Sequence, residues 1–172
     1  MRKNVVEIIE ENEKVVSAIN NLLELTKKEF MKNNTEAAQQ HAYNVAFKIY
    51  NDSFAKDKFW QYASTDLLTA FILGFCEHCK EEPQKITMKN IALMMIDLSK
   101  QTFIDLETGV EKVALDKFFE HFEPSHVARR QFATIDFTNG QMGASVLSYT
   151  TSRLGVFATK QVIEGENKCV KM

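Results

Sequence analysis

The chain has 172 residues, and 45% of them are hydrophobic, which is enough to build one compact core. Its formal net charge of -2 excludes a protein that binds nucleic acid through a high overall positive charge. Three cysteines do not make a secreted disulfide framework and favour a cytoplasmic setting. The longest apolar run, from Leu67 to Cys76, is too short to cross a bilayer, which takes ~20 residues, so we expect no membrane contact.

The first half of the chain is predicted to form four helices, because its apolar residues recur every three or four positions. Asn34, Asp57 and Thr87 each stand just before a helical pattern, where a side-chain oxygen can cap the first turn. The third pattern is apolar on nearly every side, which predicts a long, buried central helix. The four expected helices cover residues 4–33, 35–50, 58–80 and 87–98.

The second half has a weaker pattern at first and then returns to helical spacing. Residues 102–112 are expected to form a loop with a short extended piece, Ser125 to cap the helix that follows it, and Thr138–Gly140 to form a turn. Further helices are predicted over residues 114–122, 125–135 and 141–158, with a frayed tail over 164–172. Residues 1–172 are therefore expected to be a single all-α domain of about seven helices, without a β-sheet.

Cys76 and Cys79 form a CxxC motif, which can hold zinc or carry a thiol–disulfide reaction. A redox pair usually lies at a helix N-terminus, where the helix dipole lowers the thiol pKa, whereas this pair lies near a helix C-terminus. Zinc needs about four ligands, and no further histidines or cysteines stand in a pair at ligand spacing. We therefore expect cysteines on a helix face, no bound metal and no cofactor.

The chain lacks the motifs of a nucleotide-hydrolysing enzyme. It contains no GxxxxGK[ST] phosphate loop, no GxGxxG turn and no nucleophile elbow with its histidine and acid. The turn Gly140–Gly143 precedes a helix, so its backbone amides could meet an anion, but it contains no lysine. We expect no hydrolysis of ATP or GTP by this chain.

Two stretches suggest other kinds of protein. Ile86–Thr102 resembles the start of a helix-turn-helix, with the turn at Ile96–Asp97 and a recognition helix running to Leu106, as in a DNA-binding regulator. The first helix allows a heptad reading with Asn12 and Thr26 at core positions, as in a coiled-coil interaction protein. Packing of one helix stripe against the rest of the domain is the alternative to the coiled coil.

Basic residues cluster late in the chain, next to a stretch rich in Thr, Ser, Asn and Gln. Arg129 and Arg130 belong to one expected helix, Arg153 to the next, and Lys160 follows directly after it. Such a surface suits contact with DNA phosphate or with an acidic protein. We expect these four residues to form one patch for an anionic partner; the alternative is an ordinary solvated surface.

Five segments spread along the chain carry a family resemblance. They are Ala55–Trp60, Asp66–Leu73, Leu115–Phe119, Pro124–Arg129, and Ser145–Ser148 together with Arg153–Phe157. In this order and spacing they resemble the all-α domain of type IV coupling proteins, the TraG/TraD-like ATPases of conjugative DNA transfer, in their Gram-positive form. The likeness covers about residues 38–162, and it covers the first helix, residues 1–33, poorly.

The resemblance implies a domain inserted in the RecA-like motor of a membrane-anchored, hexameric ATPase. The nucleotide motifs and the membrane anchor of that parent would lie outside this chain. In that family the all-α domain lies at the cytoplasmic mouth of the channel and is implicated in recognising the relaxosome or a protein substrate. We therefore expect a non-catalytic domain that contacts the motor and docks a relaxase, a relaxosome accessory protein or DNA.

The chain departs from the family at two positions. Lys58 stands where the family usually has proline, which changes the stiffness of the entry into the third helix. Gly140–Met142 stands where the family often has a Gly-Lys-Thr-like turn, so the lysine that could contact DNA there is missing.

Overall fold

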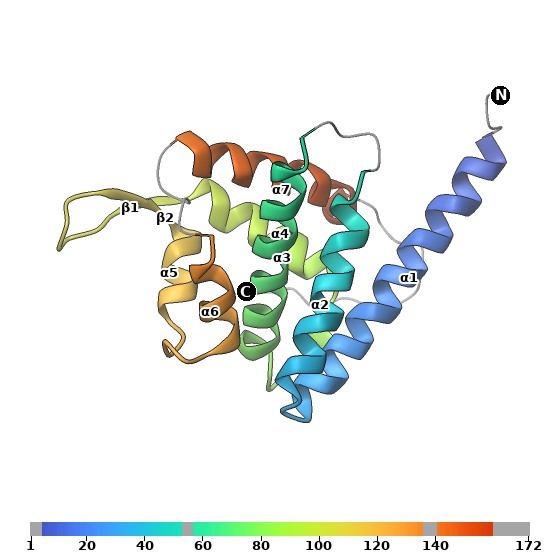
Figure 1. The fold of residues 1–172 in the computed structure, drawn as a ribbon, viewed down its shortest axis with the longest axis horizontal. Helices are drawn as coiled ribbons and strands as arrows, with labels where there is room; N and C mark the ends of the chain where they lie inside the picture. The colour runs from blue at the N-terminus through green and yellow to red at the C-terminus, as the bar shows by residue number, and fades with distance from the viewer. Residues whose placement is uncertain (1–4, 53–56, 136–140, 160–172) are drawn as a thin grey trace.

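The computed structural model describes residues 5–52, 57–135 and 141–159 (Figure 1). These residues form an all-α domain with a small two-stranded sheet, which confirms the expected fold class. Within the described ranges, no helix combines the length and the apolar character needed to cross a membrane. The α-helices are α1 (Val5–Met31), α2 (Thr35–Tyr50), α3 (Phe59–His78), α4 (Met88–Lys100), α5 (Ala114–Glu120), α6 (Val127–Ala133) and α7 (Gln141–Thr159); a 3₁₀ helix, η1, covers Pro83–Lys85, and the strands are β1 (Thr102–Ile104) and β2 (Glu111–Val113).

Helix α3 is the centre of the molecule, as its apolar sequence predicts (Figure 1). It packs against α2, α6 and α7, so its side chains are buried on nearly every side between Ala63 and Cys76. Three hydroxyls inside this core are paired: those of Ser64 and Thr150 lie 2.7 Å apart, and the Tyr50 hydroxyl donates to the Thr150 carbonyl at 2.8 Å. Pairing removes the cost of burying them, and it ties α2, α3 and α7 together.

Helices α1 and α2 form an antiparallel pair along one side of α3 (Figure 1). The C-terminal half of the α1 stripe, which includes Ile19, Leu23 and Phe30, is buried in the chain's own core. This is the intramolecular packing that stood as the alternative to a coiled coil. Asn34 stands at the N-cap of α2, but its side chain makes no capping bond; its amide instead donates to the Glu29 carboxylate at 2.8 Å.

Of the other expected side-chain caps, two are confirmed and one is wrong. Asp57 accepts from the Phe59 N–H at 2.9 Å, and Thr87 accepts from the Asn90 N–H at 3.2 Å, as expected. The cap assigned to Ser125 is wrong: α6 begins at Val127, and the Nδ1 atom of His126 accepts from the Ala128 N–H at 3.2 Å. An imidazole nitrogen can fill the role because it carries a lone pair when it is not protonated.

The expectations for residues 86–113 need two corrections. A β-hairpin occupies most of the expected loop, with Thr102 paired to Val113 and Ile104 to Glu111, so the prediction of a domain without a sheet is wrong. The helix-turn-helix reading is also wrong, because α4 continues without a turn through Ile96 and Asp97 and the expected recognition helix is strand β1. Neither residue breaks a helix, and Ile96 packs against the core.

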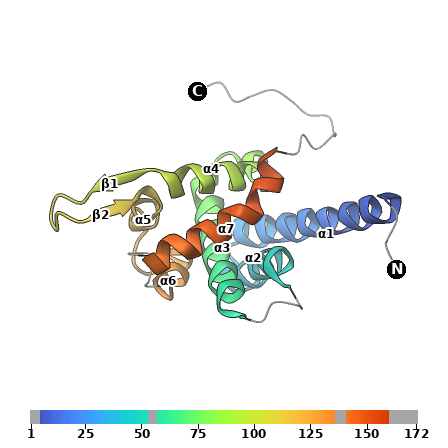
Figure 2. The ribbon, with the colours of Figure 1, turned by 90° about the horizontal axis from the view of Figure 1, so that it is seen from above.

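Helix α7 lies across α3 and α4 (Figure 2). Its inward positions are Val146, Leu147 and Leu154, which are buried, and Phe157, which is half-buried against the same core. These are the four residues expected to face inward. The turn expected at Thr138–Gly140 and the frayed tail expected over 164–172 lie outside the described residues.

Candidate interaction surfaces

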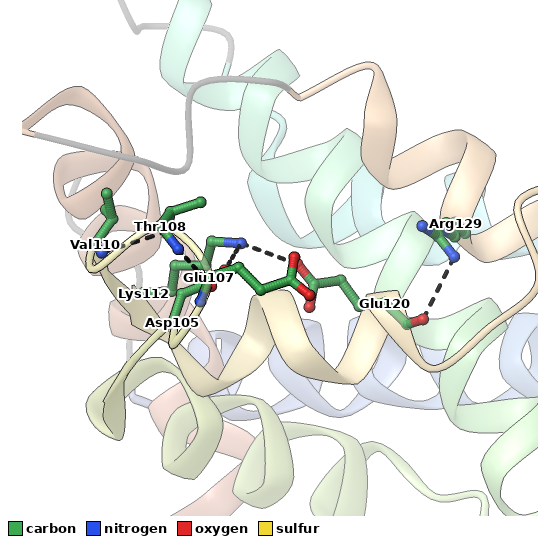
Figure 3. A network of polar contacts seen from close by, with 7 residues as sticks. All are labelled: Asp105, Glu107, Thr108, Val110, Lys112, Glu120 and Arg129. Carbon is green, nitrogen blue, oxygen red and sulfur yellow. Dashed lines mark hydrogen bonds and ion pairs between the residues drawn. The ribbon is translucent and has the colours of Figure 1, made fainter.

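Arg129, the first residue of the expected basic patch, holds two elements of the fold together. Its Nη1 atom donates to the Phe122 carbonyl at 2.7 Å. The same atom donates to the Glu120 carbonyl at 3.4 Å (Figure 3). These carbonyls lie at the C-terminal end of α5, where helix carbonyls lack partners within the helix and a cation is favoured by the helix dipole. Arg129 is therefore half-buried and engaged as a cap.

Arg153 lies on the exposed face of α7, in a different setting. Its guanidinium lies over the Tyr149 ring, 5.6 Å from the ring centroid, and Nη2 is 3.9 Å from the Asp52 carboxylate. Both contacts leave the side chain exposed, and an ion pair this long and this exposed is weak. Arg153 therefore remains able to meet an anionic group.

The structure does not bring Arg129 and Arg153 into one patch. Arg153 neighbours Asp52, whose carbonyl accepts from Gln61 near the start of α3. Arg129 contacts Phe122, whose ring lies against Gly74 near the other end of α3. More than three helical turns, roughly 20 Å, separate Gln61 from Gly74. Arg130 is exposed on α6, and Lys160 lies outside the described residues.

The CxxC cysteines belong to the core rather than to a surface. Cys76 and Cys79 are both buried near the end of α3 and form no disulfide. Burial raises the pKa of the Cys76 thiol to about 12 and also raises the pKa of Cys79. A thiol in this state is a poor nucleophile and a poor metal ligand. Across the described part of the chain, no three His, Cys, Asp or Glu side chains gather as a metal site.

The β-hairpin is the feature that the sequence analysis missed. It projects from the body of the molecule beyond α5 (Figures 1 and 2). The Asp105 carboxylate closes its turn by accepting from the N–H groups of Glu107 at 2.9 Å and Thr108 at 3.2 Å, and Gly109 adopts φ +68°. An Asx turn followed by a left-handed glycine is a known sequence signal for a tight turn, so Asp105 and Gly109 could have predicted it.

Lys112 attaches the hairpin to the body of the protein. Its ammonium lies 2.6 Å from the Asp105 carboxylate and 3.3 Å from the Glu120 carboxylate of α5 (Figure 3). The hydrogen bond from Lys112 and the N–H groups of Glu107 and Thr108 lower the pKa of Asp105 to about 2. The same contacts raise the pKa of Lys112. The turn is thereby fixed in one shape over the neutral pH range.

The pKa of Asp105 gives a testable pH dependence. Because the folded pKa is below the unfolded value, the contribution of Asp105 to stability is present above about pH 4 and is lost as the pH falls towards 2. A carboxyl-carbon NMR titration is expected to place the Asp105 midpoint near 2. Replacing Lys112 with methionine should move that midpoint towards the ordinary value, since Lys112 is the largest cause. Lys117→Met, which removes an ammonium that is not among the groups lowering the pKa of Asp105, should leave the midpoint unchanged. A wild-type midpoint near 4 would contradict the network.

The hairpin presents apolar side chains to solvent. Leu106 is 97% exposed at the turn, Ile104 is 57% exposed and Val110 is 50% exposed. We call these three side chains the hairpin tip. Apolar side chains that a rigid turn holds away from the core add nothing to the stability of the fold. Their exposure therefore indicates an interaction surface.

A groove lies between the base of the hairpin, the C-terminal part of α4 and helix α7. Its volume is about 390 Å³. Lys100 brings a positive charge to its lining, which also includes Glu111 and the ammonium of Lys112 that pairs with Asp105 and Glu120. The Ser99 and Thr151 hydroxyls donate to their own helix carbonyls and leave oxygen lone pairs to accept. We call this the α4–α7 groove; its lining residues are Ile96, Ser99, Lys100, Thr102, Glu111, Lys112, Val113, Ala144, Leu147, Ser148 and Thr151.

Comparison with known proteins adds no relative to this description: no family model, no curated protein and no solved structure matches the chain.

Proposed function

We propose that this chain is the recognition domain of a type IV coupling protein of conjugative DNA transfer. In this role it docks a relaxase, a relaxosome accessory protein or the DNA that they carry, and it performs no catalysis itself. The parent protein would supply the motor domain, the hexameric assembly and the position at the cytoplasmic face of the membrane. The proposal starts from the family resemblance of the five segments.

The packing around α3 carries the proposal. The resembling segments, far apart in the sequence, meet in one core: Phe71 of α3 lies 5.1 Å from Phe118 of α5, measured between ring centroids. Ala128 of α6 and Leu154 of α7 are fully buried in the same core. A resemblance that includes buried positions from three helices supports a shared fold, and the proposed function is an analogy from that fold.

The departure at Lys58 is compatible with this reading. The Lys58 ammonium donates to the Asp52 carbonyl at 2.5 Å and so links the end of α2 to the start of α3. A proline in that position would stiffen the entry to the helix through its fixed backbone angle. The lysine side chain therefore offers another way to fix the same connection.

The α4–α7 groove is the docking place that best suits this function. It lies next to the last long helix, where the Ser- and Thr-rich stretch places Ser148 and Thr151 beside Lys100. Lysine ammonium groups and hydroxyl acceptors together suit an extended, polar protein segment with acidic side chains.

Binding of the purified chain to the relaxase and accessory proteins of the same conjugative element tests the proposal by isothermal titration calorimetry. Ser148→Glu places a bulkier, negatively charged side chain in the groove, where it repels an acidic segment, and is expected to weaken binding at least ~10-fold, about 1.4 kcal/mol. Ser152→Glu is the matched control, because Ser152 is exposed on the same helix outside the groove. Absence of binding to all of these proteins, or equal losses in both variants, would refute the proposal.

A salt titration decides whether DNA is the partner. If DNA binds, the logarithm of the affinity falls with the logarithm of the salt concentration, by about 0.9 per phosphate contact. Arg130→Ala and Arg153→Ala, which remove exposed cations, should each lower that slope by about one. Arg129→Ala should lower stability and leave the slope unchanged, since Arg129 caps α5. Fluorescence anisotropy on a labelled duplex measures the affinity and its dependence on salt. Equal slopes for all variants would place any DNA contact elsewhere.

A further inference from the structure

The hairpin tip has a charge as well as an apolar surface. Asp105 is paired with Lys112, whereas Glu107, within the turn, and Glu111, at the start of β2, are exposed. A partner that approaches the tip therefore meets Leu106 flanked by carboxylates. The surface that fits it is an apolar depression with basic side chains at its edge.

Helix α1 provides a depression of this kind on the side of α3 away from the hairpin. A groove of about 530 Å³ runs along its C-terminal half beside η1. Leu25, Met31 and Pro83 form its apolar floor, and Leu25 is 41% exposed. We call this the α1 groove; its lining residues are Asn21, Glu24, Leu25, Lys27, Lys28, Met31 and Pro83.

The edge of the α1 groove is basic. Lys27 and Lys28 line it against one carboxylate, that of Glu24, which pairs with Lys27 at 2.6 Å. Lys28 is exposed and adds a further positive charge on the same rim. The groove thus has an apolar floor and a positively charged rim. The hairpin tip has an apolar side chain with carboxylates beside it, so the two surfaces are complementary.

We propose that the hairpin tip of one copy of this chain docks in the α1 groove of a second copy. Leu106 enters the apolar floor, and Glu107 and Glu111 lie beside Lys27 and Lys28. The second copy is required because the hairpin projects beyond α5 on one side of α3, whereas the C-terminal half of α1 lies beside α2 on the other side, so a tip does not reach its own groove (Figures 1 and 2). The contact needs only these two surfaces and does not depend on the proposed function.

This contact is head-to-tail, because different surfaces of the two copies meet. Each copy then keeps one unused tip or one unused groove, and association continues into a ring or a chain. The buried area is small, so the contact is weak and depends on protein concentration. Screening by salt should weaken it further, since charge pairs form its rim.

Sedimentation velocity over a range of protein concentrations tests the proposal. The wild-type sedimentation coefficient should rise with concentration, and Leu106→Asp and Leu25→Asp should each abolish the rise. Both residues are exposed, so both variants should keep the wild-type far-UV spectrum. Val15→Asp is the matched control, since Val15 is 49% exposed on α1 outside the groove, and it should associate like the wild type.

An equimolar mixture of the two defective variants gives the sharpest result. The Leu106→Asp chain keeps its groove and the Leu25→Asp chain keeps its tip, so one contact forms and a species of two chains appears, with no larger species. Any of three results would overturn the proposal: a wild-type chain that stays monomeric at all concentrations, a Leu106→Asp variant that associates like the wild type, or a mixture that contains only monomers. Loss of association in Val15→Asp alone would assign self-association to a coiled coil of α1 instead.

Discussion

Replacing Phe119 with alanine is expected to lower the free energy of unfolding by about 3–5 kcal/mol. Phe119 is fully buried on α5 and stacks on Phe132 of α6 with ring centroids 4.0 Å apart. Its edge also meets Phe71 of α3 at 6.4 Å. The truncation removes a ring that joins three helices and leaves a cavity that rigid neighbours cannot fill. Urea unfolding followed by far-UV circular dichroism measures the loss.

Phe103→Ala is the matched control for this prediction. Phe103 is half-buried on strand β1, where the Lys117 ammonium lies 4.4 Å from its ring centroid. Removing it forfeits a partly exposed cation–π contact and should cost about 1 kcal/mol or less. Similar losses for the two variants would show that the aromatic cluster around Phe119 does not stabilise the core more than the surface does.

The long helices were predictable because a helix of ten or more residues repeats its apolar spacing several times. Helix α3 is apolar over most of its 20 residues, and burial on nearly every side follows directly. Helix α4 was predicted from the capping hydroxyl of Thr87 and from regular apolar spacing. Local signals sufficed here, since both the cap and the stripe are properties of the helix itself.

The hairpin and the cap of α6 were not predictable by the same means. Strands β1 and β2 have three residues each, which is too short for alternation to be counted. The hairpin is held by Lys112, which reaches Glu120 of α5, and a contact between separate elements leaves no local pattern. His126 caps α6 although histidine is not among the usual capping residues. Serine is one of them, so the residue preferences favoured Ser125 instead.

Arg129 and Arg153 are not neighbours, contrary to expectation, for a geometric reason. Arg129 and Arg153 lie on consecutive helices, α6 and α7, and nearness in the sequence suggested nearness in space. The start of α7 follows α6, but Arg153 lies more than two turns further along, at the end of the molecule where α2 meets α3. The direction of α7 relative to α6 decides which end of the molecule Arg153 lies at. The sequence carries no direct signal for that direction.

Gly74 is a position where adding a side chain should destabilise the fold. A Cβ atom there would lie 2.8 Å from Cε1 of Phe118 and 3.0 Å from Cε2 of Phe122, closer than non-bonded carbon atoms approach. The absence of a side chain on α3 lets these two rings of the α5 region lie directly against the helix backbone. Glycine costs helix stability of about 1 kcal/mol relative to alanine, and this packing offsets that cost.

Gly74→Val is therefore expected to lower the free energy of unfolding by about 2–3 kcal/mol, because two branched methyl groups must displace both rings. The same substitution at Gly155 of α7 is the control, since a Cβ atom there meets nothing within 4 Å. Valine is a slightly better helix former than glycine, so Gly155→Val should change stability by less than about 0.5 kcal/mol. Paired urea denaturation curves separate the two effects: the midpoint of the Gly74 variant falls while that of the Gly155 variant stays near the wild type. Equal midpoints in both variants would mean that the Phe118 and Phe122 rings move aside at little cost, and that α5 is less firmly packed on α3 than the ring contacts indicate.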